Sequence, residues 1–96
     1  MTALPANQFI VGVDLGGTNI VVCAMSADGS RQYGLRSEPT AAHEGADHVI
    51  GRMARMVNEA VADTMHEAGV TRDAFLGVGV GAPGPLDREK GIVLVA

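Results

Sequence analysis

The sequence predicts an α/β domain in which three antiparallel strands precede one long helix and a fourth strand. Three observations support this order. Short apolar runs separated by turn residues fill positions 9–39, one stretch of helical periodicity covers positions 46–68, and an apolar run that alternates with glycine covers positions 75–81. A chain of 96 residues is long enough for one domain at most.

Composition and charge exclude several classes of protein. The net charge is −4 and the seven cations are scattered, so we expect no nucleic-acid partner. No apolar run approaches the roughly 20 residues of a membrane helix, so we expect no membrane partner. The single cysteine, Cys23, cannot form an internal disulfide. The leader Met1–Gln8 has neither a positive charge nor an apolar centre, which predicts a disordered start and a cytoplasmic location.

The first two predicted strands enclose a polar turn. The first strand, Phe9–Asp14, shows little alternation, so we expect both of its faces to be buried, as in a central strand. Leu15–Asn19 forms the turn, and Ile20–Ser26 is the second strand. Cys23, in the middle of that strand, is expected to be a small buried core residue.

A hairpin and a third strand follow. Ala27–Ser30 contains an Asp-Gly pair between two apolar runs, which is typical of a hairpin turn. Arg31–Glu38 is the third strand and Pro39 ends it, so the first three strands are predicted to form an antiparallel meander.

A connection at Thr40–Asp47 leads into a predicted helix over about Ala46–Ala68. Gly69 is in the position of a left-handed C-cap. The apolar stripe that predicts the helix consists of Val49, Met53, Met56, Val57, Ala60, Val61, Thr64, Met65 and Ala68, and the polar side carries Arg52, Arg55, Glu59, Asp63 and Glu67.

After a short connection, Phe75–Gly81 is the fourth strand, in which every second residue from Gly77 onward is glycine. Such a glycine stripe weakens a strand, so either the helix packs very close to it or a ligand approaches its backbone. The rigid loop Ala82–Asp87 and the polar turn Arg88–Gly91 follow, and another strand begins over Ile92–Val95.

This order of elements is that of the front half of an α/β domain of the ribonuclease-H-like or actin-like ATPase type. We therefore expect residues 9–96 to form the N-terminal part of such a domain. A complete copy needs two more helices and a central strand, which do not occur within the sequence.

The turn after the first strand has the chemistry of a phosphate site. Gly16 and Gly17 let backbone N–H groups converge on a phosphate, the Thr18 hydroxyl can add another hydrogen bond, and Asp14 is a hard oxygen ligand for Mg²⁺. The alternative is a hairpin in which Asp14 and Thr18 close their own backbone. The turn leads into a strand and lacks a Gly-Lys-Ser/Thr sequence, which excludes a dinucleotide fingerprint and a P-loop.

Two segments together resemble the ROK family of sugar kinases, in the hexokinase and actin ATPase superfamily. Residues 11–19, Val-Gly-Val-Asp-Leu-Gly-Gly-Thr-Asn, are similar to its first phosphate motif. Residues 77–87, Gly-Val-Gly-Val-Gly-Ala-Pro-Gly-Pro-Leu-Asp, are similar to its Gly-x-Gly-x-Gly-x-Pro-Gly-x-x-Asp segment. The strand expected at residues 91–96 also resembles the one that follows in the family.

The resemblance implies a glucokinase-like enzyme that transfers the ATP γ-phosphate to a hexose, most often at the 6-hydroxyl. By position, Asp14 would hold Mg²⁺ through water, and Asn19 would orient the turn. The β- and γ-phosphates would meet Gly16, Gly17 and Thr18. One wall of the sugar cleft would consist of Gly81, Ala82, Pro83 and Gly84. The alternative for that loop is a rigid strand exit. Asp87 is expected to form a turn ahead of Arg88.

The resemblance also implies parts that the 96 residues do not contain. The family's catalytic aspartate, its zinc site of histidine and cysteines, its adenosine pocket and its second phosphate loop would lie beyond Ala96, so this chain by itself is expected to be inactive. The histidines at positions 43, 48 and 66 lack ligand partners at suitable spacing and are expected to be solvated. The full-length enzyme is expected to be a homo-oligomer.

Three other functions remain open. A ROK regulator of transcription would place a DNA-binding unit before the first motif, where only eight residues stand. A half-domain could instead pair with a copy of itself or with a partner through exposed strand edges. Another sugar or acyl-group kinase of the superfamily would share the phosphate motif but is less consistent with the Gly-Ala-Pro-Gly loop.

Overall fold

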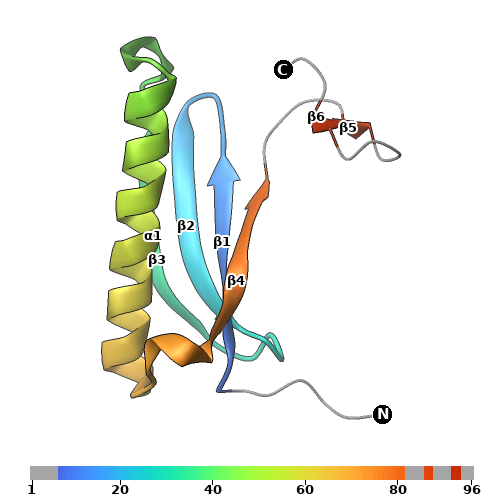
Figure 1. Ribbon diagram of the computed structural model, residues 1–96, viewed down its shortest axis with the longest axis vertical. Helices are drawn as coiled ribbons and strands as arrows, with labels where there is room; N and C mark the ends of the chain where they lie inside the picture. Colours follow the sequence, from blue (N-terminus) through green and yellow to red (C-terminus); the bar gives the residue numbers. More distant parts are fainter. Residues whose placement is uncertain (1–6, 82–85, 88–91, 94–96) are drawn as a thin grey trace.

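The computed structural model describes residues 7–81, 86–87 and 92–93. Its centre is a four-stranded sheet in the order β3-β2-β1-β4, with one long helix against it (Figure 1). The main elements are β1 (Phe9–Leu15), β2 (Asn19–Ser26), β3 (Gln32–Pro39), α1 (Ala46–Ala68) and β4 (Phe75–Gly81).

The strand pairing confirms the predicted meander. β1 pairs antiparallel with β2, and β2 pairs antiparallel with β3. The chain then crosses through α1, and β4 adds parallel to the other side of β1. The helix has the bounds that its apolar periodicity predicts, and Gly69 ends it in the left-handed conformation, with φ 68°. In the described residues, the result is an α/β arrangement of a mixed four-stranded sheet and one α-helix.

The hydrophobic core lies between α1 and one face of the sheet. The inward-facing residues of β1 and β2 are fully or almost fully buried, as are Met56 and Ala60 at the centre of the helix. Val49, Met53, Val57 and Met65 pack around this centre and are partly buried. The predicted apolar stripe of α1 is therefore its contact surface with the sheet.

The prediction that both faces of the first strand are buried is wrong. Residues of β1 alternate, so that Val11 and Val13 are buried whereas Ile10 is 43% exposed and Asp14 is exposed. Cys23 belongs to the same uncovered face and is half-buried. The prediction that Cys23 is a buried core residue is therefore also wrong. The physical reason is that α1 covers one face of the sheet and no other described helix covers the second.

One close approach between β3 and α1 depends on a glycine. Gly34 has φ +68°, and a Cβ built there would lie 2.9 Å from Ala60 Cα and 3.0 Å from Ala60 O. The pairing of β2 with β3 also shifts register between Val22 and Ala24, which bends this edge of the sheet. A side chain at Gly34 would hold the strand off the helix.

Smaller elements join the main ones. Two short 3₁₀ turns, η1 (Ala42–Glu44) and η2 (Arg72–Ala74), flank the helix in the predicted connections. Residues 86 and 87 form a two-residue strand, β5 (Leu86–Asp87), which pairs antiparallel with β6 (Ile92–Val93). The sequence predicts a strand beginning at residue 92, but it places residues 86 and 87 in a loop.

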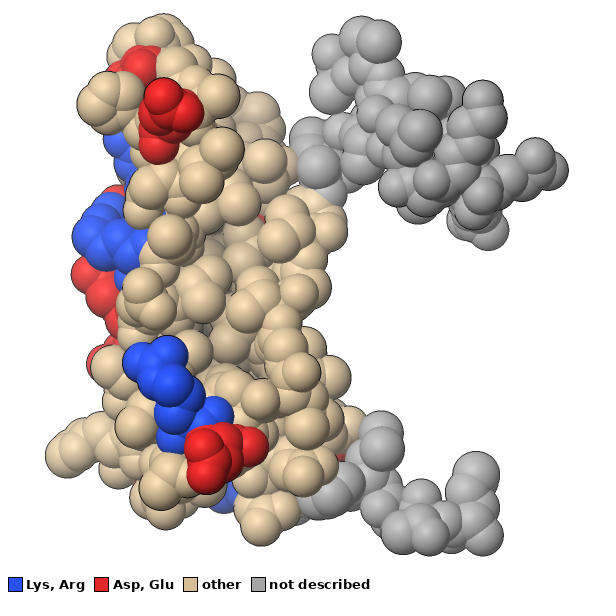
Figure 2. Space-filling model, in the orientation of Figure 1, with Lys and Arg blue, Asp and Glu red and all other residues tan. Residues whose placement is uncertain are grey.

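The polar side of α1 is tied to the edge of the sheet by ion pairs. Arg36 of β3 contacts Glu59 at 3.0 Å and also Asp63, while Arg55 of α1 contacts Glu38 of β3. Figure 2 shows the charged side chains gathered over the helix and the connection after it, whereas the surface over the sheet is largely uncharged. Within the described ranges, no helix is long and apolar enough to cross a membrane.

Candidate functional site

The fold brings the two glycine motifs of the sequence to one edge of the sheet. Because β1 and β4 run parallel, their carboxyl ends lie side by side, and Asp14 is the direct pairing partner of Gly81. The turn 16–18 follows β1 at this same end. In α/β sheets, ligands bind outside the carboxyl ends of parallel strands. Asp14, the turn 16–18 and Gly81 therefore lie together at a position suited to a ligand.

The turn between β1 and β2 is closed by its own backbone. The Gly16 N–H donates to the Asn19 carbonyl at 2.9 Å. Gly17 and Thr18 are exposed, and their N–H groups have no hydrogen-bond partner among residues 7–81. Of the donors predicted for a phosphate, those of Gly17 and Thr18 are accessible, whereas that of Gly16 is used inside the turn.

The two glycines of the turn face different surroundings. A Cβ added to Gly16 would lie 2.8 Å from the Asn19 carbonyl oxygen, closer than real Cβ contacts allow. A Cβ added to Gly17 would meet nothing within 4 Å. The turn itself thus requires glycine at position 16, while the described part of the chain gives no packing reason for glycine at position 17.

Asp14 projects from β1 on the face of the sheet that α1 does not cover. Its carboxylate makes no hydrogen bond or ion pair with residues 7–81, and neither does the Thr18 hydroxyl. The alternative in which these two side chains close the turn is therefore not what the structure has. A carboxylate and a hydroxyl that have no partner in the described ranges could instead bind a hydrated cation and an anion.

Thr40 is a residue of this region that the sequence motifs do not identify. Its N–H donates to the Thr18 carbonyl at 2.9 Å, and its hydroxyl donates to the Gly16 carbonyl at 2.7 Å. Thr40 is only 4% exposed. It stands at the end of β3, far from the turn in sequence, so a motif of adjacent residues could not reveal it.

Arg52 of α1 extends this set of contacts into the helix. Its Nη1 donates to the Thr40 carbonyl at 2.7 Å, and its Nη2 pairs with Glu44 of η1. The hydrogen bond from Arg52 lowers the pKa of the Glu44 carboxyl below its usual value. The turn is therefore connected through Thr40 to the first half of α1.

Of the loop predicted to line the sugar cleft, only Gly81 is among the described residues. Gly81 ends β4 beside Asp14, whereas Ala82, Pro83 and Gly84 lie outside the described residues. Across the described ranges no group of three His, Cys, Asp or Glu residues could hold a metal ion. His43, His48 and His66 are exposed, as predicted.

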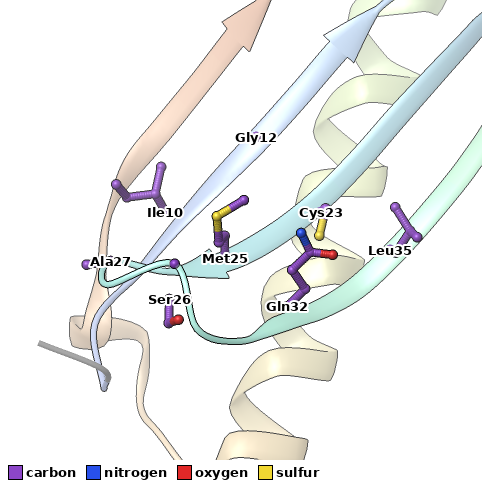
Figure 3. Close-up of a pocket in the computed structure, with 9 residues that line it drawn as sticks. Ile10, Gly12, Cys23, Met25, Ser26, Ala27, Gln32 and Leu35 are labelled. Carbon is purple, nitrogen blue, oxygen red and sulfur yellow. The ribbon is translucent and has the colours of Figure 1, made fainter.

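A shallow apolar hollow lies elsewhere on the open face of the sheet. Figure 3 shows side chains from β1, β2 and β3 around it, beside the hairpin that joins β2 to β3. Its lining consists of Ile10, Gly12, Cys23, Met25, Ser26, Ala27, Gly29, Gln32 and Leu35. Because none of the predicted phosphate or sugar residues lines this hollow, it is separate from the candidate site.

Comparison with known proteins supports the resemblance seen in the two motifs. No family model matches the chain. Over 84 residues, or 88% of the chain, it is 37% identical to the glucokinase of Thermotoga maritima. The resemblance to a glucokinase-like sugar kinase is confirmed. The chain spans only 23% of that relative's length.

A solved structure with a similar arrangement is a reductive activator for a corrinoid, iron-sulfur protein. It is 16% identical with a TM-score of 0.48, and the match covers 80% of this chain and 15% of the other.

Proposed function

We propose that the chain is the N-terminal portion of an ATP-dependent sugar kinase of the ROK family. The enzyme would transfer the ATP γ-phosphate to the 6-hydroxyl of a hexose such as glucose, and residues 9–96 would begin a ribonuclease-H-like, actin-like ATPase domain. The observation that carries the proposal is the pairing of Asp14 with Gly81, which joins the two motifs beside a turn whose tip, Gly17 and Thr18, is exposed. The 37% identity to a glucokinase supports the same reaction class.

The residues of the turn fit a magnesium–nucleotide group. Asp14 offers a carboxylate that has no partner among residues 7–81, and Gly17 leaves open space next to accessible N–H donors. Asp14 would hold Mg²⁺ through water, Gly17 and Thr18 would bind the β- and γ-phosphates, and Gly16 and Asn19 would keep the turn closed. Bound Mg²⁺ would neutralise phosphate charge during the transfer.

Sugar binding, catalysis and zinc binding would involve residues outside the turn. The loop from Gly81 to Gly84 would form one wall of the sugar cleft. The catalytic aspartate and a zinc site would lie in a C-terminal part, in an enzyme that is cytoplasmic and homo-oligomeric. Neither nucleic acid nor a membrane has a role in this proposal.

The test is to express the longest reading frame that contains this sequence and to measure hexose-dependent ATP turnover. Turnover with glucose or a related hexose is expected from that protein and not from the 96-residue chain by itself. Asp14→Asn should lower kcat by about a hundredfold or more, the scale seen when one group that stabilises charge is lost.

Asp73→Asn is the matched control for the same change of charge, because Asp73 lies in η2 at the other end of α1 from the candidate turn (Figure 1). It should leave kcat unchanged. Absence of turnover with every hexose tested, or equal effects of the two substitutions, would contradict the proposal.

A second candidate function is assembly through the sheet edge. The outer edge of β4 has no partner among the described strands, and Leu76, Val78 and Val80 of that strand are more than half exposed, at 56%, 53% and 56%. An uncharged apolar edge strand invites pairing with another chain. Sedimentation of the 96-residue chain would decide: a dimer supports assembly, and a well-folded monomer excludes it.

A further inference from the structure

We propose that Thr40 is a positioning residue for the phosphate-binding turn. Its hydroxyl and its backbone N–H would fix the direction in which the turn presents its free donors. This inference rests on the proposed kinase function for its catalytic consequence, although the geometry that carries it is independent of any reaction.

The first step of the argument is the bond from Thr40 to Gly16. The Thr40 hydroxyl donates to the Gly16 carbonyl at 2.7 Å. That carbonyl and the Gly17 N–H belong to one planar trans peptide unit, in which C=O and N–H point in opposite directions. By holding the carbonyl toward the buried Thr40, the hydroxyl turns the Gly17 N–H toward the opposite, exposed side.

The second step is the bond from Thr40 to Thr18. The Thr40 N–H donates to the Thr18 carbonyl at 2.9 Å, so one residue holds carbonyls on both sides of Gly17. The turn's own closure, from the Gly16 N–H to the Asn19 carbonyl, fixes a third group. A Cβ built on Gly17 would meet no described atom within 4 Å, so packing does not fix this residue. The hydrogen bonds to the carbonyls of Gly16 and Thr18 fix the backbone on both sides of it.

The third step concerns what holds Thr40 itself. The Arg52 guanidinium donates to the Thr40 carbonyl at 2.7 Å, and Arg52 is in turn paired with Glu44. The next residue, Ala41, has the left-handed conformation with φ 50°, which is uncommon for a residue with a side chain. The chain therefore turns sharply just after Thr40, and the helix restrains this position.

A pair of substitutions separates positioning from simple packing. Thr40→Val keeps the shape and removes the hydroxyl, so the Gly16 carbonyl loses its partner. Thr40→Ser keeps the hydroxyl and removes a methyl group from a buried site. If Thr40 acts only by filling space, the serine variant should be the more impaired. If it acts through the hydroxyl, the valine variant should be.

The experiment uses the full-length protein that carries this chain. Thr40→Val should raise KM for MgATP by roughly tenfold, the factor that corresponds to about 1.4 kcal/mol, and leave KM for the hexose near the wild-type value. Thr40→Ser should restore most of the affinity for MgATP. A wild-type KM for MgATP in Thr40→Val would overturn the inference while leaving the kinase assignment intact.

A second measurement does not depend on catalysis. In the same three proteins, hydrogen exchange of the Gly16 amide reports whether the turn stays closed. Exchange should be about tenfold faster in Thr40→Val and near wild type in Thr40→Ser, because the unanchored turn opens more often. If the wild-type protein phosphorylates no hexose, the kinase proposal fails and this exchange measurement decides the inference. Equal exchange rates in all three proteins would overturn it.

Discussion

Substituting alanine for each glycine of the turn should separate the stability of the turn from its use. At Gly17 the new methyl group would meet no atom of the described residues within 4 Å. We therefore expect the free energy of unfolding to change by less than about 0.5 kcal/mol, as for other surface substitutions without a structural role. A bound phosphate would meet this methyl group directly, so binding of MgATP should weaken.

At Gly16 the expected effects differ. The new Cβ would lie 2.8 Å from the Asn19 carbonyl oxygen, which is the acceptor that closes the turn. A backbone atom cannot move aside as the end of a flexible side chain can, so the turn must open or shift. Overpacking of this kind costs about 1–3 kcal/mol. Gly16→Ala should therefore lower the free energy of unfolding and, through the distorted turn, also raise KM for MgATP.

The two variants are compared by urea unfolding and by KM for MgATP in the full-length protein. For Gly17→Ala we expect wild-type stability with KM raised by about tenfold or more, since a methyl group blocks the approach to the donors. A wild-type KM in this variant would refute the claim that the turn receives a phosphate. Unchanged stability in Gly16→Ala would refute the described closure of the turn.

Two further predictions concern the structure around the turn. Gly34→Ala should destabilise the chain by about 2–5 kcal/mol, because it adds overpacking against Ala60 to the cost of a positive φ. The control Gly29→Ala, at φ +78° with no described atom within 4 Å, should show only the cost of about 1–2 kcal/mol for the positive φ. Equal losses of unfolding free energy in urea would contradict this reasoning. Because Arg52 lowers the pKa of Glu44, this pair stabilises the fold above the usual Glu pKa of 4.5 and loses that contribution as pH falls below it. NMR titration of Arg52→Gln should show the pKa of Glu44 rising toward 4.5, and an unchanged pKa would exclude Arg52 as the cause.

Local sequence patterns were sufficient to predict the order of the elements. Helical periodicity and a glycine C-cap depend on neighbouring residues, so the bounds of α1 and the role of Gly69 agree with the structure. The Asp-Gly hairpin signal likewise places the turn between β2 and β3 correctly, where Gly29 has φ +78°. These features are encoded within a few residues of where they occur.

Features that depend on distant residues could not be predicted in this way. Thr40 contacts the turn only because β3 pairs with β2, and Gly34 is required only because α1 packs on β3 at Ala60. The open face of β1 was also mispredicted. A continuous apolar run indicates that something covers both sides of a strand, but it does not say that the covering element lies in the same stretch of sequence.

The glycine stripe of β4 shows how the structure decides between two alternatives that the sequence left open. Gly77, Gly79 and Gly81 pair with Ile10, Gly12 and Asp14, which belong to the face of the sheet opposite α1. A Cβ on Gly77 or Gly79 would meet nothing within 4 Å, so close packing of α1 cannot be the reason for these glycines. What remains is the approach of a group from outside the described residues. The glycine stripe of β4 ends at Gly81, which pairs with Asp14. This is the same edge of the sheet as the turn that Thr40 holds in place.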